Sequence, residues 1–203
     1  MKKTHSIIIS LLVVALSSCS DFLDVKPVGQ MIPDEVYQFE NILNNTSTLD
    51  YFMMDNNRGC FYALMGDNVE VSENQMNHKY NATYPNLDLL AAYIFYQPVL
   101  DPKATYSGWS WGMFRPLGLF NNVIDGVSDI DSESEYAKGV IAQAKVGRAW
   151  IYLNATLAYG PMYDPNGSND TKVLPYRSSG DPTQPNGPLL TTAELFDKIK
   201  EDL

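Results

Sequence analysis

Cys19 is the residue whose setting points most clearly to a chemical reaction. It ends a Leu-Ser-Ser-Cys sequence at residues 16–19, after Lys2, Lys3 and an apolar run over residues 7–16 that is too short to span a bilayer. This arrangement is typical of a bacterial lipobox, in which the thiol takes a diacylglycerol, the preceding peptide is removed and the new amine is acylated. Each buried methylene contributes about 0.8 kcal/mol, so two or three acyl chains, such as palmitate, anchor a protein firmly. We expect lipidation at Cys19; an uncleaved membrane anchor and an ordinary signal with a chance cysteine are the alternatives.

The sequence offers little for catalysis or metal binding. His78 is the one histidine left after residues 1–18 are removed, and a lone histidine among polar residues is more often solvated than catalytic. No H-E-x-x-H, G-x-S-x-G, phosphate-loop or Cys/His metal pattern is present in the sequence. Asp67 and Glu70 could serve as a glycosidase pair, but any acidic chain offers such pairs. We therefore expect no catalytic residue, no cofactor and no metal site.

One acidic stretch superficially resembles a calcium-binding loop. Residues 164–170 read Asp-Pro-Asn-Gly-Ser-Asn-Asp, but the glycine stands at the fourth position rather than the sixth and the bidentate glutamate is missing. A solvated turn between a helix and a strand is the better interpretation, with weak calcium binding a minor alternative.

Composition indicates a chain that does not bind nucleic acid. The formal net charge of the 203 residues is −10, and removing Lys2 and Lys3 makes it more negative. No cluster of basic residues interleaves with aromatic ones, so polyanions should be repelled. Cys60 is the only cysteine besides Cys19, so no disulfide framework is expected. We divide the chain into a lipoprotein signal peptide over 1–18, a tether over 19–33 and a folded region over 34–203.

Helical periodicity dominates the folded region. Apolar spacing predicts helices from Asp34 to the polar residues 44–47, over about 109–127 with a kink or late start at Pro116, and over about 133–159. The last of these helices carries on one face Ile141, Ala144, Arg148, Tyr152, Leu153 and Leu157. Residues 50–108 read as irregular except for a short helix over 87–100, and residues 164–190 read as a long loop. Thr191 and Glu194 form a capping box for a final helix. Its apolar face has no later helix to cover it, which suggests an incomplete domain; that face comprises Leu195, Phe196, Ile199 and Leu203.

Five stretches carry a resemblance to one family, in the same order along the chain. They are the Cys-Ser-Asp-Phe-Leu-Asp-Val-Lys-Pro sequence at 19–27; Pro-Asp-Glu-Val-Tyr at 33–37; the helix pattern of Trp109, Phe114, Leu117, Asn121 and Ile124; the pattern of Arg148, Ala149, Tyr152, Leu157 and Tyr159-Gly160-Pro161; and Leu174-Pro175 followed by the helix at 192–203. Together they resemble the SusD/RagB family of surface lipoproteins. Gly147, where the family usually has Leu, and Leu189-Leu190, which replace a frequent Arg, depart from its pattern.

The resemblance implies a mainly α fold of tetratricopeptide-like helical pairs with long irregular loops, of which this chain is an incomplete, N-terminal portion. It also implies a binding protein that is not an enzyme and that sits on the outer membrane, lipid-anchored and exposed at the cell surface. Such a protein caps a SusC-like TonB-dependent transporter and delivers oligosaccharides to it, or peptides in the RagB branch.

In the family, loops before the helix at Trp109 contribute to the ligand surface, which directs attention to residues 66–96. Carboxylate and amide groups suit sugar hydroxyls, and tyrosine rings offer stacking faces. The expected ligand-binding residues are Asp67, Asn68, Tyr84, Tyr93 and Tyr96. For Tyr93 and Tyr96, at helical spacing, burial in a core is the competing interpretation.

Besides the oligosaccharide-binding function and its peptide-binding variant, two other functions stay open on the sequence. They are a structural or adhesive surface lipoprotein and a lipid-anchored glycoside hydrolase. A neighbouring gene for a TonB-dependent transporter would favour the binding proteins, and hydrolysis of a glycan panel would favour the hydrolase.

Overall fold

A computed structural model describes residues 32–46, 66–67, 70, 95 and 112–203 of the chain. Its helices and strands all belong to the unit Pro33–Leu203. The expected signal peptide and most of the tether lie outside the described residues, as do Cys19, Cys60 and nearly all of the region 50–108.

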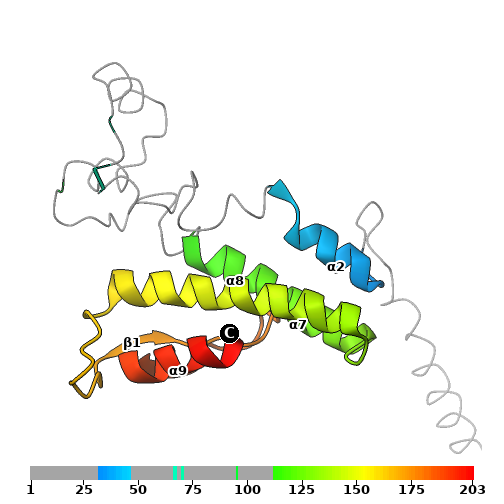
Figure 1. The fold of residues 1–203 in the computed structure, drawn as a ribbon. Coiled ribbons are helices and arrows are strands. Elements are labelled where there is room, and N and C mark those ends of the chain that lie inside the picture. Colours follow the sequence, from blue (N-terminus) through cyan, green and yellow to red (C-terminus); the bar gives the residue numbers. More distant parts are fainter. Residues whose placement is uncertain (1–31, 47–65, 68–69, 71–94, 96–111) are drawn as a thin grey trace, which may run out of the picture. The chain divides into compact units, whose positions relative to one another are not determined.

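Helices make up most of the described structure (Figure 1). They are α2 (Val36–Leu43), α7 (Arg115–Ile130), α8 (Glu135–Tyr159) and α9 (Thr192–Asp202). Two short strands, β1 (Lys172–Pro175) and β2 (Leu189–Thr191), lie between α8 and α9 in the sequence. The expectation of a mainly α fold is therefore confirmed.

Helices α7 and α8 form an antiparallel pair joined by the short link at residues 131–134 (Figure 1). Asp131 accepts hydrogen bonds from the amides of Glu133 and Ser134, and Ser134 caps α8 by accepting one from the amide of Ala137 at 3.1 Å. The buried face of α7 follows helical spacing and includes Leu117, Phe120, Val123 and Val127. Helix α7 begins at Arg115, and residues 112–114 directly before it form a π-helical turn. Pro116 therefore lies in the first turn of the α-helix, where the helix type changes, and neither a simple late start nor a kink within α7 describes it fully.

Two glycines allow an aromatic ring to approach a helix closely. A Cβ atom added to Gly147 of α8 would lie 2.4 Å from the ring of Phe120 on α7. A Cβ atom added to Gly126 of α7 would lie 2.4 Å from the ring of Phe39 on α2. The glycines therefore set how closely these three helices pack.

Residues 164–190, expected to be a long loop, contain the whole of β1 and the start of β2. The two strands pair antiparallel, with Leu174 opposite Leu190 and Pro175 opposite Leu189. Both strands are too short to show a clear alternation in the sequence, which is why periodicity did not predict them. The turn at 164–170 is mostly exposed and is closed by the side chain of Asn169, which accepts a hydrogen bond from the amide of Asp164 at 2.9 Å and donates one to the carbonyl oxygen of Asp164 at 2.7 Å.

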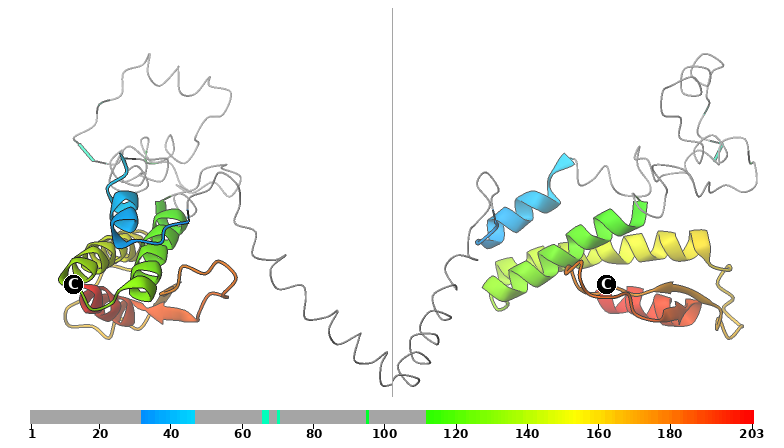
Figure 2. Two further views of the ribbon diagram at one scale, coloured as in Figure 1. Left: turned by 90° about the vertical axis from the view of Figure 1, so that its right-hand side faces the viewer. Right: turned by 180° about the vertical axis from the view of Figure 1, so that it is seen from behind.

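Helix α9 packs along α8 and the strands, on the side away from α2 (Figure 2). The predicted capping box of Thr191 and Glu194 is present. The expectation that the apolar face of α9 is uncovered is wrong for most of its residues: Leu195 and Ile199 are buried, and Phe196 packs on Tyr163 with ring centres 4.8 Å apart. Preceding elements of the chain supply this cover, and only Leu203 of the four is largely exposed, at 78%.

Two other expectations need correction. Leu157, placed on the buried face of its helix by periodicity, is 56% exposed. The buried residues in the last turns of α8 are Ile151, Tyr152, Asn154, Ala155 and Thr156 instead. The predicted helix over 87–100 lies outside the described residues except for Phe95. Phe95 itself has a φ of 53°, in the left-handed region, so this residue does not adopt the right-handed helical conformation expected for it.

Candidate functional site

The residues expected to bind ligand lie almost entirely outside the described part of the chain. Asn68, Tyr84, Tyr93 and Tyr96 are not described, and neither is the lipidation residue Cys19. Asp67 is described and is exposed in a turn. The described structure therefore does not bring the predicted ligand residues together.

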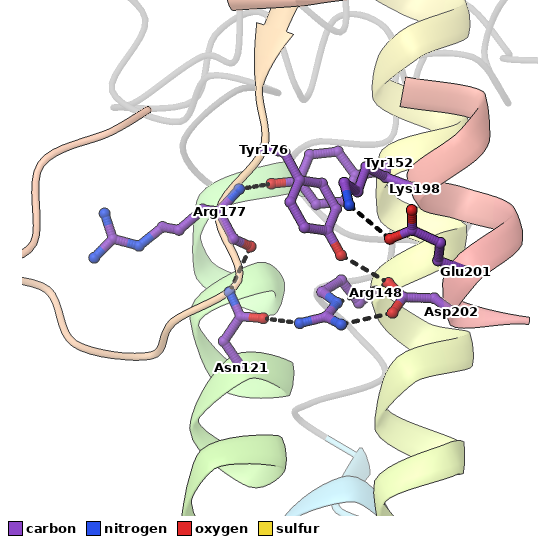
Figure 3. A network of polar contacts seen from close by, with 8 residues as sticks. All are labelled: Asn121, Arg148, Tyr152, Tyr176, Arg177, Lys198, Glu201 and Asp202. Atoms are coloured by element: carbon purple, nitrogen blue, oxygen red, sulfur yellow. Dashed lines mark hydrogen bonds and ion pairs between the residues drawn. The ribbon is translucent and has the colours of Figure 1, made fainter. Parts of the chain in front are cut away.

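The best-defined polar site in the described structure centres on Arg148, in the middle of α8 (Figure 3). Its side chain is buried, with the residue only 6% exposed, and it meets the carboxylate of Asp202 through two parallel hydrogen bonds of 2.8 and 2.6 Å. A third hydrogen bond, 2.9 Å long, joins the guanidinium to the side-chain oxygen of Asn121 on α7. One arginine thus links α7, α8 and α9.

Two tyrosines complete this network. The hydroxyl of Tyr176 donates to Asp202 at 3.1 Å, and the Tyr176 ring packs on that of Tyr152 with centres 4.7 Å apart. The Tyr152 hydroxyl accepts a hydrogen bond from the amide of Arg177 at 2.7 Å and lies 3.5 Å from the carbonyl oxygen of Pro175. The segment that follows β1 is therefore fixed to α8 and α9.

Burial and charge shape the protonation of these groups. Burial alone would lower the pKa of Arg148, but hydrogen bonding to Asp202 and the surrounding charges raise it above the ordinary value. Burial raises the pKa of Tyr152 to about 12, and burial also raises that of Tyr176. Arg148 stays charged and both tyrosines stay neutral near pH 7, so these three groups anchor the structure rather than transfer protons.

A second arginine closes the loop that follows β1. Arg177 donates to the carbonyl oxygens of Ser179, Asp181 and Gln184 and to the side-chain oxygen of Asn186. Beside it lies a hollow of about 100 Å³ lined by residues of the same loop, from Tyr176 to Gly187. Ligand pockets usually measure about 300–1,000 Å³, so this hollow is too small for a sugar ring with its neighbours.

Helix α7 holds this loop through polar side chains. The carboxylate of Asp125 accepts a hydrogen bond from the amide of Gly180 at 2.7 Å, and Asn121 donates to the carbonyl oxygen of Arg177 at 3.0 Å. A Cβ atom added to Gly180 would come within 2.8 Å of the Cα of Asn122, so only glycine fits this contact without a shift. Polar contacts from α7 and α8 therefore attach this loop to the helical pair.

Sequence reasoning placed Arg148 and Tyr152 on the helix but missed their partners Asp202, Tyr176 and Arg177. A signal for Asp202 was present. A buried arginine needs a carboxylate partner, and Asp202 continues the buried face of α9 at helical spacing after Leu195 and Ile199. Periodicity counts apolar residues only, so it overlooked a charged residue on the same face.

Within the described residues, no group of three or more His, Cys, Asp or Glu side chains could hold a metal ion. None of the described helices combines the length and apolarity that crossing a membrane requires. In comparisons with known proteins, no family model matches the chain, and no curated protein matches it significantly.

Proposed function

We propose that this protein is a lipid-anchored outer-membrane protein of the SusD/RagB type, exposed at the cell surface. In this proposal it binds oligosaccharides and delivers them to a SusC-like TonB-dependent transporter without chemical change. The observation that carries the proposal is the lipobox ending at Cys19, together with five family-like stretches in family order, the first of which begins at Cys19.

The described structure supports the proposal through the positions of motif residues. Asn121 belongs to one family-like stretch, Arg148 and Tyr152 to the next, and Asp202 to the last. These stretches are far apart in the sequence, yet their polar residues meet in one buried network (Figure 3). A shared structural role would explain why these residue types recur together in the family pattern.

The proposed fold is the tetratricopeptide-like arrangement, in which α7 and α8 form one helical pair and α9 opens the next. The antiparallel packing of α7 on α8, the short link and the packing of α9 along α8 are all compatible with it. The ligand-binding surface would then be built from loops on this helical frame, with Asp67, Asn68, Tyr84, Tyr93 and Tyr96 as the proposed contacts.

Calorimetry of the purified chain against oligosaccharide and peptide panels tests the proposed ligand class. Where an oligosaccharide binds, we expect Tyr84→Ala to weaken affinity by about tenfold, because a lost ring stacking contact is worth about 1 kcal/mol and lost burial adds to it. Tyr37→Ala is the matched control, since Tyr37 lies exposed on α2 outside the proposed site. Binding of peptides alone would favour the RagB-type function instead. Cleavage of the oligosaccharides would contradict a purely binding role.

A further inference from the structure

The loop between β1 and β2 has a fixed base and an exposed tip. The base, residues 177–180, is attached to α7 and α8 by hydrogen bonds with Asn121, Asp125 and Tyr152. The tip, residues 181–187, is exposed along its whole length and buries no apolar side chain. A segment with few buried apolar contacts has low local stability. Hydrogen bonds therefore decide whether the tip stays against the base.

One side chain of the base reaches across to the tip. Arg177 points away from the buried ion pair between α8 and α9 (Figure 3). It donates hydrogen bonds to the carbonyl oxygen of Gln184 at 3.0 Å and to the side-chain oxygen of Asn186 at 3.3 Å, and a further one to the tip at its first residue. Elsewhere in the described structure, residues 182–187 form hydrogen bonds only with Asp181, which belongs to the tip itself. Arg177 is thus the side chain that joins the second half of the tip to the base.

The contacts of Arg177 differ from those of the buried Arg148. The acceptors of Arg177 are neutral oxygens, and none of the ion pairs among the described residues includes it. Arg177 is also only partly buried, so water can take the place of each acceptor. Because one hydrogen bond is then exchanged for another, the net free energy of each contact is modest. The tip can therefore leave the base without breaking the ion pair of Arg148.

Prolines make the tip suited to move as one piece. Pro182 and Pro185 lie within it, Pro188 follows it, and each proline ring fixes one backbone angle. The carboxylate of Asp181 adds a restraint, since it accepts hydrogen bonds from the amide and the hydroxyl of Thr183 at 2.8 and 2.7 Å. These restraints act within the tip, so losing the contacts of Arg177 changes how the tip is attached rather than its internal turn.

The two parts of the loop that Arg177 joins enclose the hollow described above. Tyr176 and the base line one side of it, and Gln184, Pro185 and Gly187 of the tip line the other. We propose that the tip is a strap over this hollow and that Arg177 is the latch that holds the strap closed. Release of the guanidinium frees the strap and widens the hollow, while the base and the helices keep their contacts.

NMR relaxation of the full chain, purified in detergent, tests the proposal. The order parameters of the amides of Thr183, Gln184 and Asn186 report the strap, and that of Gly180 reports the base. In the native protein we expect values near about 0.85 for all four amides, which is typical of rigid backbone. Arg177→Ala should lower the three strap values below about 0.6, the range of flexible backbone, and leave Gly180 and the helices unchanged.

Two further variants show that the effect belongs to the latch. Asn186→Ala removes one acceptor of Arg177 and should lower the strap values by a smaller amount. Gln184→Ala is the matched control, because Arg177 binds the backbone carbonyl of this residue and not its side chain, so the strap should stay rigid.

A native strap with order parameters already below about 0.6 would overturn the proposal, and so would an equally rigid strap in Arg177→Ala. Loosening of the base and the helices together with the strap in Arg177→Ala would also overturn it, because the strap would then not be a separate element. These experiments concern a single loop, so their outcome does not depend on the proposed function.

Discussion

Arg148 is held by a carboxylate that stands at an unfavourable end of a helix. Asp202 is the last residue of α9, where the helix dipole disfavours negative charge. The bidentate contact with Arg148 and the hydroxyl of Tyr176 offset that penalty. Because both charges are buried, removing one of them leaves the other without compensation, which costs far more than losing an exposed pair.

We predict that Asp202→Asn lowers the free energy of unfolding by about 3–5 kcal/mol, because it leaves Arg148 charged and buried without its counter-ion. Asp197→Asn on the same helix is the matched control. Asp197 pairs with Lys200 on the surface, with both side chains about 70% exposed, and its loss should cost about 0–1 kcal/mol. Urea denaturation of both variants gives the comparison.

Equal losses of unfolding free energy in Asp202→Asn and Asp197→Asn would show that the buried ion pair stabilises the fold no more than the exposed one. A further variant, Arg148→Met/Asp202→Leu, removes both charges together. We expect it to recover much of the stability lost in Asp202→Asn, since apolar residues of similar volume can replace a buried ion pair.

Alkaline pH should destabilise the protein through its buried tyrosines. The pKa of Tyr152 is raised to about 12 in the folded state, above the ordinary value of 10.0, so between these pH values the unfolded chain has lost a proton that the folded protein keeps. The stabilising contribution is complete below pH 10 and declines as pH rises toward 12, by about 1.4 kcal/mol per pH unit for one such group. Urea unfolding at pH 9, 10 and 11 should show this decline, and Tyr152→Phe should show a shallower one. Identical slopes in the two proteins would contradict this assignment.

At the scale of helices and strands, the contact between α7 and α8 depends on Gly147. We predict that Gly147→Ala lowers the free energy of unfolding by about 1–3 kcal/mol, because the added methyl group meets the ring of Phe120. The matched control is Gly139→Ala, also on α8, where an added Cβ meets nothing within 4 Å. Replacing that glycine should stabilise the helix by about 0.5–1 kcal/mol.

Thermal unfolding of the two glycine variants distinguishes these effects by their opposite signs. Adding Phe120→Leu to Gly147→Ala should restore part of the loss, because the smaller side chain makes room for the methyl group. A stabilising effect of Gly147→Ala would mean that the helices do not approach as closely as described.

The elements that the sequence predicted correctly are those with a local signal. The capping box at Thr191 and the helix starting near Pro116 depend on residues within one turn of each other, so their chemistry can be read locally. The exposure of Leu157 and the burial of most of the apolar face of α9 were misjudged because both depend on which segments, distant in the sequence, lie against each helix. A strand was expected after the turn at 164–170, but the pairing of Leu174 with Leu190 was missed because each strand has too few residues to show a period.

The candidate site was predictable to a smaller extent. Arg148 stood out as a charge within an apolar pattern, but its contacts with Asn121, Tyr176 and Asp202 join three segments far apart in the chain. A single sequence does not show which of its distant segments lie close together in the folded protein. The proposed ligand residues between 66 and 96 stay a prediction, with Asp67 the one member that the structure describes.

At the scale of the whole molecule, the proposed lipid anchor at Cys19 would decide where the protein resides. We predict that Cys19→Ala abolishes incorporation of labelled palmitate and moves the protein out of the membrane fraction, because no acyl chain is then attached. Cys60→Ala, which changes the chain's other cysteine, should leave both properties unchanged. Fractionation of cells expressing each variant gives the result, and palmitate labelling that survives Cys19→Ala would contradict lipidation at this residue.

Co-purification from the native outer membrane tests the proposed function most directly. The chain, tagged at a surface loop and expressed in its own host, is extracted in mild detergent, and the proteins that accompany it are identified by mass spectrometry. The proposed function predicts a TonB-dependent transporter in near-equal amount, lost when Cys19→Ala releases the chain from the membrane. A lipidated protein recovered from the outer membrane without any such transporter would contradict it.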